Sequence, residues 1–67
     1  MMLSDLVRVK WTSVVMNSTD RFREPGELGV LISYEQAGWS TSASKYAFVM
    51  FGDGNIDIIN SAGLEQL

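Results

Sequence analysis

The segment Asp53-Gly54-Asn55-Ile56-Asp57 contains the side chains of this chain that best match a metal-binding motif. Its three alternating oxygen-bearing side chains match the start of an EF-hand calcium loop, which also needs glycine at its sixth position and glutamate at its twelfth. Here those positions hold Ile58 and Leu64. We therefore expect a turn with solvated acids, with no metal site and no cofactor.

Nucleophilic catalysis lacks its usual partners in this chain. Serines are plentiful, but the sequence contains no histidine to act as their base and no cysteine to act as a thiolate. Lys10 and Lys45 could in principle act as bases, and no spacing links either of them to a serine. The sequence therefore predicts no catalytic residues and a protein that is not an enzyme.

Basic residues stand beside aromatic ones at Arg21-Phe22-Arg23 and at Lys45-Tyr46, a pattern that can bind single-stranded nucleic acid by stacking and phosphate contact. Asp20, Glu24 and Glu27 lie among the first of these groups and offset its positive field. The formal net charge of −3 also disfavours a phosphate-binding surface. We therefore do not expect nucleic acid as the partner.

The chain has 67 residues, the length of a single small domain, residues 1–67. No apolar run approaches the roughly 20 residues that a membrane helix needs. The opening Met1-Met2-Leu3-Ser4-Asp5 lacks the basic and apolar regions of a signal peptide. We therefore expect an intracellular protein that is neither secreted nor membrane-bound, and no small-molecule substrate is indicated.

The strongest structural signal is Lys45 to Asn60, in which two apolar runs flank Asp53-Gly54. Asp-Gly in this setting is typical of a β-hairpin with a two-residue type I′ turn, where both central residues have φ > 0. With that turn, Phe51 faces Ile56 across the hairpin. The core face of the hairpin is then expected to carry Ala47, Val49, Phe51, Ile56 and Ile58.

The opposite face of this hairpin is also largely apolar and is interrupted only by Asp57. A hairpin with one face in water should alternate more cleanly between apolar and polar residues. Trp39, in the polar loop from 35 to 44, is interpreted either as a lid that fills the core or as part of an aromatic groove. We predict that a protein partner or a second copy of the chain contacts a face made of Trp39, Tyr46, Phe48, Met50 and Ile59.

Two further strands are predicted, Leu6–Trp11 from its alternation and Gly29–Tyr34 from its apolar run. The polar stretch from 17 to 26 is expected to be a loop that closes at a Pro25-Gly26 turn and is pinned by Phe22. The core residues expected from these two strands are Val7, Val9, Val30 and Ile32.

The last residues predict a short closing element. Ser61-Ala62-Gly63 is expected to form a turn, with one turn of 3-10 helix as an option. Leu64–Leu67 is expected to follow as an edge strand. With four to five short strands, a chain this small should curl into a barrel, because closure removes most of the exposed sheet edge.

The order of these parts resembles the small stand-alone SH3-like barrels that tailed phages, marine ones especially, encode. Short motifs carry the resemblance: Asp5-Leu6-Val7-Arg8-Val9, Leu28-Gly29-Val30-Leu31-Ile32, Val49-x-Phe51-x-Asp53-Gly54 and Gly63-Leu64-Glu65. The resemblance implies an all-β, SH3-like barrel of about five short strands with two long polar loops. The loop from 36 to 44 is long for this group.

These features predict a non-catalytic SH3-like barrel that acts as a protein-interaction or assembly module, with self-association as one form of it. Two alternatives remain open. One is an RNA-binding ring of Sm-like type, although the chain lacks the N-terminal helix pattern and the base-holding motifs of such proteins. The other is a phage-type inhibitor that binds a host protein through an acidic surface, which would place the protein in the host cytoplasm.

Overall fold

The computed structural model describes residues 3–36 and 45–67. Strands make up most of this part of the chain, so the predicted all-β class is confirmed, and the described residues contain no helix of the length and apolarity needed to cross a membrane. The elements are β1 (Leu6–Val9), β2 (Ser13–Val14), β3 (Phe22–Arg23), β4 (Leu28–Gln36), β5 (Lys45–Phe51), β6 (Ile56–Asn60), the 3-10 turn η1 (Ser61–Gly63) and β7 (Leu64–Gln66).

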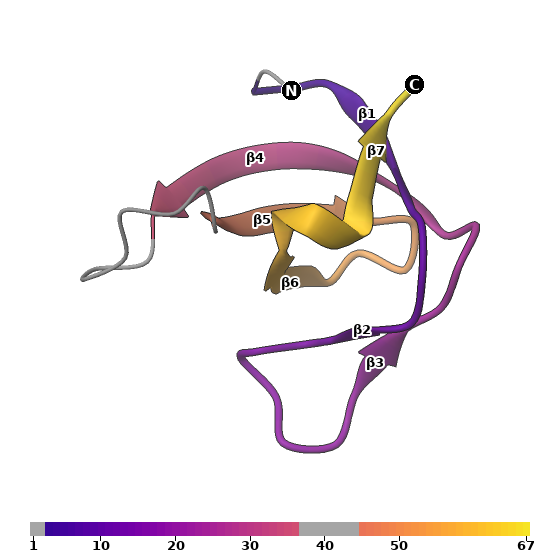
Figure 1. The fold of residues 1–67 in the computed structure, drawn as a ribbon, viewed down its shortest axis with the longest axis vertical. Helices are drawn as coiled ribbons and strands as arrows, with labels where there is room; N and C mark the ends of the chain where they lie inside the picture. Colours follow the sequence, from indigo (N-terminus) through magenta and orange to yellow (C-terminus); the bar gives the residue numbers. More distant parts are fainter. Residues whose placement is uncertain (1–2, 37–44) are drawn as a thin grey trace.

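Five of the strands form one antiparallel sheet in the order β6-β5-β4-β1-β7, and β2 and β3 pair with each other in a separate hairpin. The long strand β4 arches over β5, and β7 returns to lie beside β1 (Figure 1). Pro25-Gly26 forms the predicted tight turn before β4, and Gly26 has a φ of +92°. The predicted 3-10 turn and closing strand are also present.

The β5–β6 hairpin has a three-residue turn, so the predicted two-residue turn is wrong. The backbone N–H of Phe51 donates to the carbonyl oxygen of Asn55 over 3.0 Å, and that of Gly54 donates to Phe51 over 3.0 Å. Gly52, Asp53 and Gly54 therefore form the turn. Gly54 has the predicted positive φ, +87°. A type I turn followed by a left-handed residue is the usual three-residue hairpin connection.

The additional turn residue shifts β6 by one position from the predicted register. Met50 lies opposite Ile56 instead of Asp57. Because side chains alternate between the two faces, a one-residue shift moves every β6 side chain to the other face. Asp57 and Ile59 are buried in the core, whereas Ile56 is exposed and Ile58 is half-buried. The predicted core positions of Ile56 and Ile58 are therefore wrong, and so is the predicted surface position of Ile59.

The same inversion occurs in β4. Leu31 is fully buried, whereas Val30 is half-buried and Ile32 is exposed, the reverse of the prediction. A β-bulge between Leu31 and Ser33 also leaves Ile32 without a partner in β5. Both errors arise because apolar residues occupy both faces of these strands. The core consists of Val7, Val9, Val15, Leu31, Ala47, Val49, Phe51, Ile59 and Leu64.

Gly29 lies opposite Phe51, where the sheet leaves no room for a side chain. A Cβ atom on Gly29 would lie 2.5 Å from Val49 Cγ1 and 2.9 Å from the carbonyl oxygen of Met50. We expect Gly29→Ala to lower the free energy of unfolding by about 1–3 kcal/mol, measured by urea denaturation, because the core must shift to accept the methyl group. Gly52→Ala is the matched control, since a Cβ there meets no atom within 4 Å, and equal losses for both variants would contradict the packing.

The outer edge of β6 is occupied by the segment that follows β2. The backbone N–H of Met16 donates to the carbonyl oxygen of Ile58 over 2.7 Å. The side-chain amide of Asn17 continues this pairing, because its Nδ2 donates to the carbonyl oxygen of Ile56 and its Oδ1 accepts from the N–H of Ile58, both over 3.2 Å. Backbone groups that an edge strand would present to solvent are thus hydrogen-bonded.

Candidate interaction surface

The outer face of the large sheet carries an uninterrupted row of apolar residues across four strands. Ile56 lies opposite Met50, Met50 opposite Val30, and Val30 opposite Leu6. Directly opposed residues share one face of a sheet, so these four side chains form one surface, called here the outer row. Val30 is half-buried, and the other three side chains are between 43% and 48% exposed. At about 4.8 Å between strands, the row is roughly 14 Å wide.

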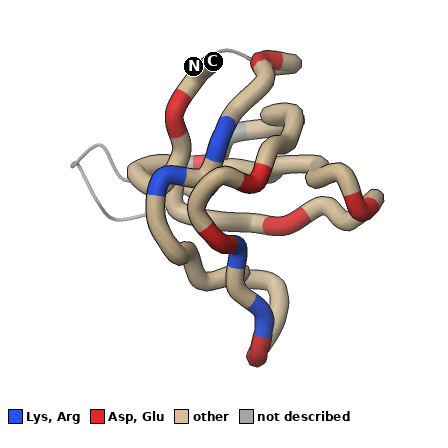
Figure 2. Tube along the Cα trace, turned by 90° about the vertical axis from the view of Figure 1, so that its right-hand side faces the viewer, with Lys and Arg blue, Asp and Glu red and all other residues tan. Residues whose placement is uncertain are grey.

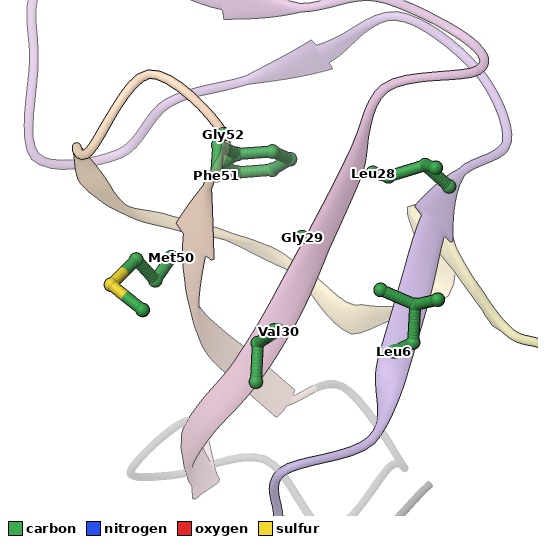
Figure 3. A pocket seen from close by; sticks show the side chains of 7 residues that line it. All are labelled: Leu6, Leu28, Gly29, Val30, Met50, Phe51 and Gly52. Atoms are coloured by element: carbon green, nitrogen blue, oxygen red, sulfur yellow. The ribbon is translucent and has the colours of Figure 1, made fainter.

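An open hollow of about 300 Å³ lies beside the outer row (Figure 3). Leu6 and Leu28 lie on one side of β4 and Met50 on the other, with the backbone of Gly29 between them. The absence of a side chain at Gly52 leaves this region open. Its lining consists of Leu6, Leu28, Gly29, Val30, Met50, Phe51 and Gly52. This lining carries no charge, so the chemistry suits an apolar group.

Three of the five residues predicted for the contact face lie on the outer side of β5. Tyr46, Phe48 and Met50 alternate there with buried residues, and exposure increases to Met50 at the hollow. Ile59 is fully buried on the core side because of the register shift. Trp39 lies outside the described residues, so its place as lid or groove residue stays a prediction.

The sequence prediction missed Leu6, Leu28, Val30 and Ile56 as members of this surface. The alternation of β1 already placed Leu6 on the side away from Val7. What the alternation could not show is that β1 pairs with β4 and so aligns Leu6 with Val30. The outer row is assembled from three segments that are distant in sequence, and only the sheet order brings them together.

On the core side, Arg23 joins three carboxylates. Its Nε donates to Asp57 Oδ2 over 2.7 Å, its Nη1 to Glu27 Oε1 over 2.9 Å and its Nη2 to Asp53 Oδ2 over 3.0 Å. Arg23 is 5% exposed and Asp57 is 1% exposed, so their ion pair is part of the core. The guanidinium carbon also lies 3.9 Å from the centroid of the Phe51 ring.

The predicted loop from 17 to 26 is interrupted by strand β3, and Arg23, not Phe22, fixes this segment against the sheet. Phe22 is 58% exposed, so its predicted role as the pin is wrong. Arg21 adds a second contact, because its Nη2 donates to Asp57 Oδ2 over 2.8 Å. The other oxygen of Asp57, Oδ1, is buried and accepts no hydrogen bond from the described residues.

Each arginine of the chain is paired with a carboxylate, since Arg8 also bridges to Glu65 over 2.5 Å. Figure 2 shows acidic segments lying beside basic ones in the β2–β3 hairpin. Burial alone would lower the pKa of Arg23, but its hydrogen bonds to carboxylates outweigh burial and raise that pKa above its ordinary value. Arg23 therefore stays charged within the core.

Asp53, one of the three carboxylates that bind Arg23, makes the stability of the fold depend on pH. The backbone N–H of Asn55, which donates to Asp53 Oδ1 over 3.1 Å, and the guanidinium of Arg23 lower the pKa of Asp53. A depressed carboxyl pKa contributes stability that is present above its unfolded value, about 3.9, and is lost as the pH falls through the folded value.

We therefore expect Asp53→Asn to melt at a lower temperature than the wild-type protein at pH 6. The difference should begin to shrink below about pH 4 and should vanish once the pH has fallen through the lowered pKa of folded Asp53, because the wild-type carboxyl is then protonated in both states. Thermal melts of both proteins from pH 2 to pH 7 measure it. A constant difference over that range would show that the Asp53 charge does not stabilise the fold.

Comparisons of the chain with protein-family profiles, with curated proteins and with solved structures found no match. The geometry of the described residues is therefore what bears on function. Asp53 and Asp57, the acids of the calcium-like segment, both contact Arg23. Within the described ranges, no three His, Cys, Asp or Glu side chains are grouped so as to hold a metal ion.

Proposed function

We propose that the protein is a non-catalytic interaction module with an SH3-like fold, and that it binds a protein partner through the outer row and the adjoining hollow. The order of elements supports the fold. A first strand is followed by the β2–β3 arm, then by the meander β4-β5-β6, a 3-10 turn and a last strand beside the first. This order agrees with the family that the sequence motifs resemble.

The observation that carries the proposal is the outer row itself. Four apolar residues are aligned across four strands, and three of them expose large side chains to solvent where a half-solvated sheet would carry polar ones. The largest exposed apolar patch on a typical protein covers about 300–600 Å² and is often functional. At about 25 cal/mol per Å², covering such a patch is worth several kcal/mol before the costs of association are subtracted.

A second copy of the chain is the partner we propose. A two-fold contact needs only one surface, because each copy presents the same patch to the other. The outer row carries no charge, so the net charge of −3 does not oppose this contact locally. Nucleic acid is a poor fit, because the arginines are already paired with carboxylates.

The test is the mass in solution of the wild type and of Met50→Glu, measured by multi-angle light scattering at matched concentrations. We expect the wild type to self-associate and Met50→Glu to be a folded monomer, because the substitution buries a charge in the contact. Val14→Glu is the matched control, since Val14 is also an exposed apolar residue, at 59% against 43% for Met50, but lies on β2, outside the outer row. A wild type that stays monomeric up to about 1 mM would overturn self-association.

A further inference from the structure

The β5–β6 hairpin has two pairing registers that its apolar residues would support. In the observed register, Met50 lies opposite Ile56, and Asp57 enters the core. In a register shifted by one residue, with Asp53-Gly54 as a two-residue turn, Met50 would lie opposite Asp57. The core would then receive Ile56 and Ile58, and the carboxylate would reach solvent. Apolar burial and turn preference therefore do not favour the observed register.

We infer that the ion pair between Arg23 and Asp57 selects the observed register and thereby decides which side chains β6 presents on the outer face. Arg23 comes from the other hairpin, 34 residues away in sequence, and is also held by Glu27 and Asp53. Only the observed register turns the Asp57 carboxylate to the side of the sheet where Arg23 lies. In the shifted register, the guanidinium would lose its buried partner. Fixing a register is the best-attested use of a buried polar contact.

This selection regulates the composition of the outer row. In the observed register, Ile56 completes the row beside Met50. In the shifted register, Asp57 would take that place and put a carboxylate into an otherwise apolar surface. The expected weakening of partner contact rests on the proposed function, whereas the selection of the register does not.

Cysteine cross-linking measures the register directly, because the chain contains no cysteine of its own. Phe48→Cys combined with Ile58→Cys places thiols on residues that are opposed in the observed register. Phe48→Cys combined with Ile59→Cys places them on residues opposed only in the shifted register. Opposed residues of an antiparallel pair are close enough for a disulfide, whereas residues on opposite faces are not. Oxidation in a glutathione buffer, followed by mass spectrometry, gives the cross-linked fraction of each pair.

The expected result for the otherwise unchanged chain is efficient cross-linking of the 48/58 pair and little of the 48/59 pair. Asp57→Ile removes the carboxylate and leaves Arg23 with Glu27 and Asp53, so we expect the 48/59 fraction to rise severalfold. Asp57→Asn is the matched control, because its side-chain oxygen can still accept from Arg23. We expect it to cross-link as the unchanged chain does.

If Asp57→Ile forms the 48/58 disulfide but no more of the 48/59 disulfide than the otherwise unchanged chain, the ion pair does not select the register and the inference is overturned. If circular dichroism shows that Asp57→Ile is unfolded, Arg23→Met combined with Asp57→Ile replaces the ion pair by apolar groups and takes its place. That variant should also cross-link both pairs, and the 48/58 pair alone would again overturn the inference. A monomeric wild type would leave these results unchanged, so the register and the proposed function can fail separately.

Discussion

Phe51→Ala is expected to lower the free energy of unfolding by about 3–5 kcal/mol, which is enough to unfold a domain of this size. The Phe51 ring is almost fully buried and fills the space opposite Gly29. It also lies against the guanidinium of Arg23. Truncation would therefore leave a cavity in the core and would remove the contact that covers a buried charge.

Urea denaturation followed by circular dichroism measures this loss. Phe22→Ala is the matched control, because it removes the same atoms from a side chain that is mostly exposed. We expect that control to change the free energy of unfolding by no more than about 0.5 kcal/mol. A Phe51→Ala variant as stable as the control would place Phe51 outside the core.

Arg23→Met is expected to cost a similar amount, about 3–5 kcal/mol. The substitution introduces an apolar side chain of comparable length, removes the buried partner of the Asp57 carboxylate and leaves Asp57 only the partly exposed Arg21. Removing one member of a buried pair is costly because the charge left in the core is poorly compensated, and the partly exposed Arg21 offsets only part of that loss. Asp57 Oδ1 has no hydrogen bond from the described residues that could compensate.

Arg21→Met provides the comparison, because Arg21 binds the same Asp57 oxygen but its side chain is 40% exposed. A partly exposed pair of this kind contributes about 1 kcal/mol or less, so we expect a small loss, measured again by urea denaturation. Equal losses for the two arginine variants would contradict the distinction between them. The ion pair would be dispensable if Arg23→Met lowered the free energy of unfolding by less than about 1 kcal/mol and also left the 48/59 cysteine pair uncross-linked.

Local features of the fold could be predicted from the sequence because each depends on neighbouring residues. Gly54 has the positive φ that its place after Asp53 requires, and Pro25-Gly26 closes its loop. The alternation of β1 correctly placed Val7 and Val9 in the core. These features involve contacts within a few residues, and the amino-acid types alone specify them.

The register of β6 could not be predicted, because it depends on whether Gly52 belongs to the strand or to the turn. Asp53-Gly54 by itself favours the shorter turn. Ile56 and Ile58 on one side and Ile59 on the other made both registers acceptable for an apolar core. The residue that distinguishes them, Asp57, is buried only because Arg23 reaches it from a distant segment.

The candidate surface was predicted only in part, because it too depends on pairing between distant segments. Phe48 and Met50 lie on the predicted side of β5, because the register shift affects β6 alone. Leu6 and Val30 join Met50 only through the pairing of β1 with β4 and of β4 with β5. No periodicity within one segment reveals such an alignment, because it is a property of strand order.

The amide of Asn17 on the edge of β6 limits the ways in which copies of this protein can join. Cross-β growth requires each sheet to have two open sides, one to receive a strand and one to offer it to the next molecule. On the β6 side, Asn17 and Met16 already bond to Ile56 and Ile58. If the free edge of β7 paired with a strand of another molecule, growth would stop there, because the β6 edge of the same sheet is already hydrogen-bonded. The fold thus opposes endless filaments built by edge-to-edge strand pairing.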